Sequence, residues 1–104
     1  DDMKDVIDRL NKAFENRIRL GIMSALMVNE SVDFLTFKEL LDVTDGNLAS
    51  HVSALEKVEY IAVKKEFVGK KTKTSYIVTT LGKKEFIAHL NALEKLVKQN
   101  RKLT

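Results

Sequence analysis

The chain of 104 residues contains no cysteine and no proline. The absence of cysteine excludes disulfide bonds and thiolate metal sites, and the absence of proline suits a chain made mostly of helices. No hydrophobic run is long enough to span a membrane and no signal peptide is visible, so we expect a cytoplasmic protein that has no membrane partner. The length predicts a single domain over residues 1–104 with a modest core.

Residue patterns that would carry catalysis are also missing. The chain has two histidines, His51 and His89, and they fall on separate predicted helices. It has neither a phosphate-cradling glycine loop nor a serine nucleophile elbow. With no cysteine beside them, two separated histidines do not make a metal site. We therefore expect no enzyme activity, no metal and no cofactor, and the sequence identifies no small-molecule effector.

Positive charge is concentrated in the second half of the chain. Residues 1–43 hold six basic and nine acidic side chains, for a net charge of −3. Residues 44–76 hold six and four, and residues 77–104 hold six and two, so these parts carry +2 and +4 within a total of +3. Such an asymmetry points toward a polyanionic partner.

The stretch from Thr44 to Lys57 predicts a short amphipathic helix. Thr44 or Asp45 can cap its start by accepting a hydrogen bond from a free backbone N–H. Leu48, Val52 and Leu55 share one face and should be buried. The residues off that stripe are small or polar, namely Asn47, Ser50, His51, Ser53 and Ala54. Such a face could read base edges in a DNA major groove, or it could simply face water.

A β-hairpin is predicted directly after this helix. Apolar and charged residues alternate over Ile61–Phe67, which is strand spacing, and residues 74–79 form a second β-rich run. Between them lies a charged turn with one glycine, Val68–Lys73. Five lysines and one glutamate lie between Ala62 and Tyr76. Lysines on such a turn can neutralise phosphates, although a solvated loop would have the same composition.

Further helices are predicted on either side of this region. Helical spacing covers Met3–Ala13 and Glu15–Val28. Arg17 and Arg19 could pair with nearby carboxylates, which we favour, or reach a phosphate. Residues 32–35 read as one extended segment. Thr36 is then expected to cap a short helix to about Val43, with Glu39 completing a capping box. A last helix is expected from Leu81 to Arg101, after Thr79 or Thr80.

The first helix has a narrow apolar face that could pack on its own domain or on a second subunit. The last helix is longer than a small domain needs to close its core, and a stripe of this kind often meets a partner helix, so residues 1–14 and 82–104 are candidates for contact with a second copy. The alternative is that the last helix folds back on its own chain. The residues expected at the contact between copies are Val6, Leu10, Phe86, Leu90, Leu93 and Val97.

The order of these elements is that of a winged helix-turn-helix domain, and local motifs extend the likeness. Residues 48–57 resemble the recognition helix of MarR-type and ArsR-type regulators, with His51 matching and Ser50 standing where arginine is usual. Residues 76–82 resemble the ending of the family's wing, and residues 15–23 resemble the opening of its first core helix. Glu59 stands where glycine is usual.

The resemblance implies a mainly α (α+β) fold with a two-stranded β-hairpin wing and long terminal helices. It also implies a homodimeric transcriptional regulator that binds double-stranded DNA, with a recognition helix at about residues 46–57 in the major groove and a wing at about 68–74 on the backbone or minor groove. The alternative is a winged-helix module that binds protein rather than DNA. The DNA-contact candidates are Asn47, Ser50, His51, Ser53, Lys57, Lys64, Lys70, Lys71, Thr72 and Lys73.

Overall fold

The computed structural model describes residues 2–101. Its elements in chain order are α1 (Met3–Asp8), the 3-10 helix η1 (Lys12–Phe14), α2 (Arg17–Val28), β1 (Val32–Asp33), α3 (Phe34–Leu41), α4 (Asp45–Lys57), β2 (Ile61–Val68), β3 (Lys71–Val78) and α5 (Thr80–Asn100). This order confirms the expected α+β, winged helix-turn-helix fold. Of the two terminal helices, only α5 is long.

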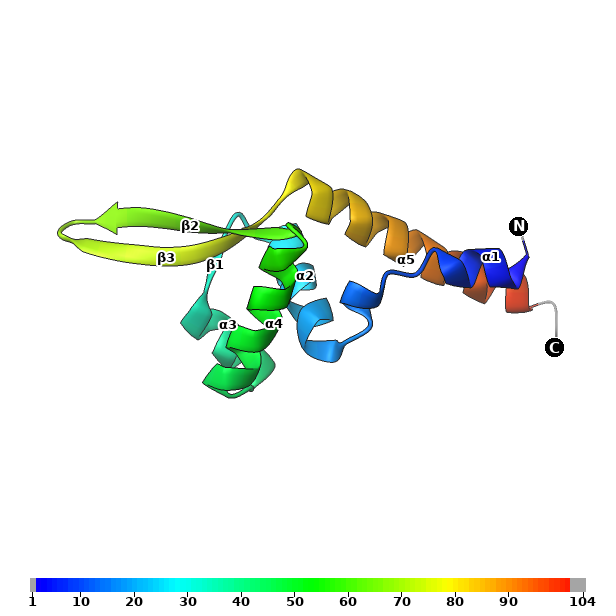
Figure 1. Ribbon diagram of the computed structural model, residues 1–104, viewed down its shortest axis with the longest axis horizontal. Coiled ribbons are helices and arrows are strands. Elements are labelled where there is room, and N and C mark those ends of the chain that lie inside the picture. The colour runs from blue at the N-terminus through cyan, green and yellow to red at the C-terminus, as the bar shows by residue number, and fades with distance from the viewer. Residues whose placement is uncertain (1, 102–104) are drawn as a thin grey trace.

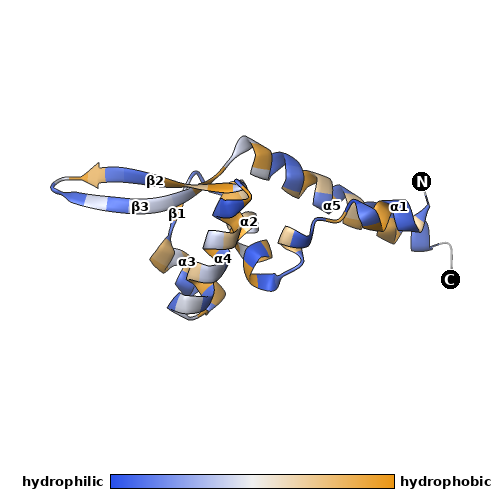
Figure 2. Ribbon diagram, in the orientation of Figure 1, coloured by the Kyte–Doolittle hydropathy of each residue, from blue (hydrophilic) through white to orange (hydrophobic). Residues whose placement is uncertain are grey.

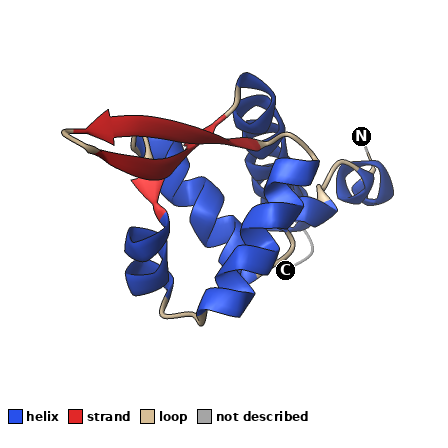
Figure 3. Ribbon diagram, turned by 60° about the vertical axis from the view of Figure 1, so that its left-hand side comes forward, coloured by secondary structure: helices blue, strands red, loops and turns tan. Residues whose placement is uncertain are grey.

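The described chain is elongated, with extents of 60 × 26 × 21 Å. The β2–β3 hairpin projects from one end, and α1 lies against the last part of α5 at the other (Figure 1). Helices α2, α3 and α4 occupy the middle, below the sheet (Figure 3). The two candidate binding regions, wing and terminal helices, are therefore at opposite ends.

The core forms where α2, α3 and α4 meet the sheet and α5. Leu48, Val52 and Leu55 of α4 are buried, as their spacing predicts. The largest fully buried side chains around them come from η1, α2 and α3 and include Phe14, Ile22, Met23, Leu26 and Phe37. Because α4 rests on this core by one stripe, the side opposite that stripe is exposed and can meet another molecule.

Two of the three predicted helix caps are confirmed. Thr44 accepts from the backbone N–H of Asn47 at the start of α4, and Thr79 accepts from that of Gly82 at the start of α5. The prediction for Thr36 was wrong. The cap is Asp33, whose carboxylate accepts from the Thr36 N–H at 2.8 Å, so α3 begins at Phe34. Hydrogen bonding from the Thr36 side chain, together with this bond from its N–H, lowers the pKa of Asp33.

The predicted first helix, Met3–Ala13, is broken after Asp8. Asn11 causes the break because its side-chain oxygen accepts from the backbone N–H of Ala13, which competes with helical hydrogen bonding. Its side-chain amide donates to the Tyr60 hydroxyl at 2.8 Å, and its backbone N–H donates to Nδ1 of His89 at 3.0 Å. Asn11 thus joins three segments that are distant in sequence.

The wing is part of a three-stranded antiparallel sheet of order β1-β3-β2. The short strand β1 pairs with the base of β3, opposite Ser75 and Tyr76. The predicted turn over residues 68–73 was too long, because the strands continue to Val68 and resume at Lys71. The turn consists of Gly69 and Lys70. Gly69 has φ +65°, as the first position of a tight type II′ hairpin turn requires.

The exit from α4 explains the motif around Glu59. The N–H groups of Glu59 and Tyr60 donate to the carbonyls of Glu56 and Leu55, a Schellman ending of the helix. Glu59 consequently adopts φ +63°, a conformation that favours glycine, which is the usual residue in the resembled family. The next carbonyl, that of Tyr60, accepts from the Thr79 N–H, which fixes the hairpin and α5 beside α4.

Candidate nucleic-acid interface

The outward face of α4 is made of small and polar residues. Gly46, Ser50, Ser53 and Lys57 recur every three or four positions on the side opposite the buried stripe, and all four are exposed. Asn47 is also exposed, at the edge of this face. Four of the sequence-predicted DNA-contact residues therefore share one accessible side of the helix. Asn47, Ser50 and Ser53 have short side chains, so another molecule can approach the helix backbone closely. Lys57, which is long, lies at the C-terminal end of the helix.

His51 is turned toward its own chain. It is half-buried, and its Nδ1 lies 3.0 Å from Nη1 of Arg19 in α2. Because Arg19 can only donate, Nδ1 must accept, which requires a neutral imidazole protonated at Nε2. Burial and the neighbouring guanidinium both lower the pKa of His51. Of its two ring nitrogens, Nε2 is left for an outside partner, as a donor.

Arg19 is a structural residue rather than the member of a carboxylate pair that we expected. Its Nε donates to the carbonyl of Ala13 at 2.6 Å, and Nη2 reaches the carbonyl of Lys12 at 3.5 Å. The same side chain that contacts His51 therefore also holds η1. Charge-assisted bonds of this kind fix the position of the recognition helix relative to the start of α2.

The wing carries most of the accessible positive charge that we predicted. Lys70 lies in the turn, Lys71 opens β3, and Lys73 follows two residues later on the same face of that strand. All three are exposed, as is Thr72 between them. Lys65 is exposed on the opposite face of the hairpin. Cations thus surround the outer half of the wing.

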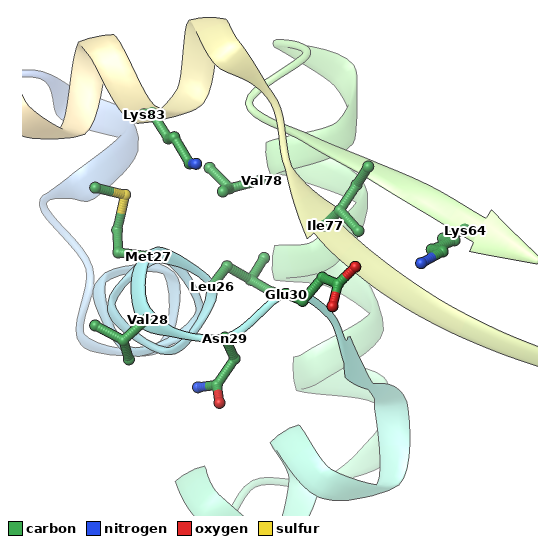
Figure 4. A pocket seen from close by; sticks show the side chains of 9 residues that line it. All are labelled: Leu26, Met27, Val28, Asn29, Glu30, Lys64, Ile77, Val78 and Lys83. Carbon is green, nitrogen blue, oxygen red and sulfur yellow. The ribbon is translucent and has the colours of Figure 1, made fainter.

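Lys64 differs from the other wing lysines because it is already paired. Its Nζ lies 3.0 Å from a carboxylate oxygen of Glu66, and it points toward Glu30 across a pocket of about 490 Å³ (Figure 4). Glu66 and Glu30 raise the pKa of Lys64. The pocket also includes Lys83 from α5 and lies at the base of the wing. Lys64 is therefore a predicted contact whose charge is offset by a carboxylate 3.0 Å away, and Lys73 interacts more weakly with the carboxylate of Asp33.

The two helices of the helix-turn-helix are linked by an ion pair. Lys38 of α3 lies 2.9 Å from a carboxylate oxygen of Asp45, the first residue of α4. Both side chains are solvent-exposed, so the pair contributes little to stability. It does neutralise an acidic group at the N-terminal end of α4.

The predicted dimer-contact residues fall into two groups. Val6 and Phe86 are buried within the single chain, where α1 packs on α5 and where α5 meets the core, so their side chains do not face a second copy. Leu10 is half-buried. Leu90, Leu93 and Val97 are 43, 40 and 70% exposed. The last three form an unpaired apolar stripe along α5. Residues 1 and 102–104 of the predicted contact segments lie outside the described residues.

The second histidine, His89, belongs to the interior. It is 4% exposed, its ring packs against Phe14 at 5.3 Å, and Nδ1 accepts the Asn11 N–H. Burial lowers the pKa of His89 below its usual 6.5, with Glu15 opposing part of that shift. It therefore joins the two ends of the chain as a neutral hydrogen-bond acceptor.

We predict that acidification destabilises the fold through His89. The unfolded chain binds a proton at about pH 6.5 and the folded chain only at lower pH, so stability is complete above pH 6.5 and declines below it. Thermal melts from pH 7.5 to 5 should show the Tm falling by roughly a few degrees. His89→Asn replaces the imidazole with an amide whose oxygen can accept the same hydrogen bond without titrating, so its Tm should change less with pH. If the Tm of His89→Asn falls as much between pH 7.5 and 5, the pH dependence belongs to other groups.

Two further findings concern residues 2–101 only. No helix in that range is long and apolar enough to cross a bilayer. In the same range, no three His, Asp or Glu side chains lie together in a way that would hold a metal ion.

Sequence reasoning did not identify three features of this region. The contact between Arg19 and His51, the pairing of Lys64 with Glu66, and the exposure of Phe67 all depend on where distant or alternating residues point in space. Of these three features, only the exposure of Phe67 could have been predicted from the sequence. It closes the alternating run near the tip of a hairpin, where no helix follows closely enough to cover it.

Known proteins resemble this chain over most of its length. Residues 18–97 match the family model of the winged helix DNA-binding domain. An uncharacterized protein of Methanocaldococcus jannaschii is 31% identical over 87 residues, covering 84% of this chain and 95% of that protein. A transcriptional regulator homologue from Pyrococcus horikoshii has a TM-score of 0.79 at 27% identity, covering 93% and 94% of the two chains. A MarR-like regulator structure from Bacillus cereus shares the fold, with a TM-score of 0.66 at 16% identity, covering 98% and 78%.

Proposed function

We propose that this chain, because it belongs to the winged helix DNA-binding domain family, binds double-stranded DNA as a homodimer and regulates transcription. The observation that carries the proposal is that one domain presents both the polar face of α4 and the lysine-rich wing. A helix with a small, polar outward face lies in the same domain as a hairpin with lysines around its outer half. The similar structure from Pyrococcus horikoshii, a transcriptional regulator homologue, supports the same role.

The two surfaces would make different kinds of contact. Asn47, Ser50 and Ser53 can approach base edges in the major groove, where asparagine can pair with adenine through two hydrogen bonds. The exposed wing lysines would contact phosphates, which positions the protein without reading sequence. His51 would act through Nε2 only, because Arg19 holds its other nitrogen.

The unpaired stripe on α5 supports a two-fold assembly. Leu90, Leu93 and Val97 lie in the second half of α5, the helix that runs toward the end of the molecule opposite the wing (Figure 1), so a second copy can pack there without covering either DNA-facing surface. Two recognition helices related by a two-fold axis would then enter half-sites roughly one DNA turn apart, about 34 Å.

The test of the proposal separates sequence reading from backbone contact. A preferred duplex is first selected from a random pool, and binding to it and to an arbitrary duplex is measured by fluorescence anisotropy. Asn47→Ala/Ser50→Ala should weaken binding to the preferred duplex roughly tenfold and leave the arbitrary duplex almost unchanged, because only base contacts are lost.

The matched control is Ser24→Ala. Ser24 is an exposed serine on α2 whose hydroxyl donates to the carbonyl of Leu20, and it lies away from α4's outward face. It should bind both duplexes as the unaltered chain does. A chain that selects no preferred duplex and ignores all DNA at low salt would contradict the proposal and favour the protein-binding alternative.

A further inference from the structure

Phe67 is the exposed exception among the phenylalanines. It is 82% exposed, whereas Phe14, Phe37 and Phe86 are at most 3% exposed and Phe34 is half-buried. Its neighbour Val68 is 60% exposed. Removing a phenylalanine side chain from water stabilises a fold, and the isolated chain forgoes that stabilisation at the wing. Figure 2 shows the resulting hydrophobic colour at the end of β2.

The position of Phe67 in the hairpin places it close to the tip. It lies opposite Thr72, and Val68 lies opposite Lys71 beside the Gly69–Lys70 turn. No other element packs against this end, because the hairpin extends beyond the helices (Figures 1 and 3). The two apolar side chains are therefore presented outward on a narrow, two-stranded support.

The surroundings of Phe67 are cationic. From residue 67 to residue 73 the chain carries Lys70, Lys71 and Lys73 and no acidic residue. The nearest carboxylate on the hairpin is that of Glu66, which is paired with Lys64. Phe67 shares its face of the hairpin with Lys65, whereas Lys71 and Lys73 lie on the other face, so cations lie on both sides of the tip. An apolar side chain at such a tip suits a partner that combines regularly spaced negative charge with stacked apolar surfaces.

We propose that Phe67 is a wedge that enters the minor groove of duplex DNA and opens a base-pair step, with the wing lysines holding the phosphates on either side. A two-stranded ribbon is wider than an undistorted minor groove of about 6 Å, so the tip would enter only where the inserted side chain opens the groove. Apolar side chains used in this way unstack the step and bend the duplex. The deformation is easiest at pyrimidine–purine steps, so the protein would prefer sequences that contain such a step without hydrogen-bonding to its bases.

This inference rests on the proposed DNA-binding function and adds a residue and a deformation to it. It assigns binding energy to an apolar contact, which is insensitive to salt, beside the salt-sensitive contacts of the lysines. The two contributions can therefore be separated in one titration series.

The test compares Phe67→Ala with the unaltered chain on a duplex of about 30 base pairs carrying dyes at both ends, so that anisotropy reports affinity and energy transfer reports bending. Phe67→Ala should bind roughly tenfold more weakly with the same salt slope, and the bend should be reduced or lost. The matched control is Val28→Ala, an apolar residue on α2 with the same 82% exposure, which should change neither quantity.

Three outcomes would overturn parts of this account in distinguishable ways. If the unaltered chain binds no duplex, the proposed function fails. If it binds and Phe67→Ala binds and bends DNA equally well, only the wedge is wrong. If Phe67 is needed instead for binding to anionic phospholipid vesicles, with DNA binding indifferent to it, the apolar tip serves a membrane surface and the wedge is likewise wrong.

Discussion

Replacing the three outermost wing lysines with alanine, as Lys70→Ala/Lys71→Ala/Lys73→Ala, is expected to weaken binding to every duplex by roughly a hundredfold at moderate salt. Each lysine that contacts a phosphate releases a counterion, and a dimer carries two wings. The slope of log K against log salt should therefore flatten by about 5. The fold should be unaffected, because all three side chains are exposed.

A matched variant separates contact from net charge. Lys4→Ala/Lys12→Ala/Lys98→Ala also removes three positive charges, from exposed positions on α1, η1 and α5 away from the wing. If the lysines act only through long-range attraction to DNA, both variants should lose the same affinity. Direct contact predicts that the wing variant loses far more affinity and slope than the control. Equal losses would remove the wing from the interface.

The second large effect is expected at the other end of the molecule. Leu90→Glu/Val97→Glu places two charges in the apolar stripe of α5 while keeping good helix-forming residues. The dimer should dissociate to monomers in sedimentation experiments, because burying unpaired carboxylates is strongly unfavourable. Binding to a two-fold site should fall by roughly a hundredfold or more, since each half-site is then bound independently.

The control for this variant is Val28→Glu. Val28 is even more exposed than Leu90 and Val97 but lies on α2, outside the stripe, so the chain should remain dimeric and bind DNA normally. Circular dichroism should show equal helix content in both variants. If Leu90→Glu/Val97→Glu stays dimeric, the copies meet through another surface. If the unaltered chain is monomeric, the two-fold arrangement is wrong.

Elements with strong local signals were predictable from the sequence. The predictions that depend on neighbours within a few residues are the helix caps at Thr44 and Thr79, the buried stripe of α4 and the alternating residue pattern of β2. The prediction that Thr36 caps α3 was wrong because the carboxylate of Asp33, three residues earlier, accepts the capping hydrogen bond and the helix starts sooner.

Features that depend on distant contacts were not predictable. The break after α1 reflects what Asn11 meets in space, namely Tyr60 and His89. The pairing of the short strand β1 with β3 joins residues more than forty positions apart. Within the candidate site, the polar face of α4 followed from helical spacing, whereas the orientation of His51 was set by Arg19 in another helix.

The most direct test of the central claim is the salt dependence of duplex binding by the unaltered chain, measured by anisotropy together with the number of chains bound per site. The account predicts two chains per site and a slope of log K against log salt of about −5 or steeper, since two wings supply at least six phosphate contacts. A slope near zero, or no binding at low salt, would contradict it and direct attention to a protein partner for the same surfaces.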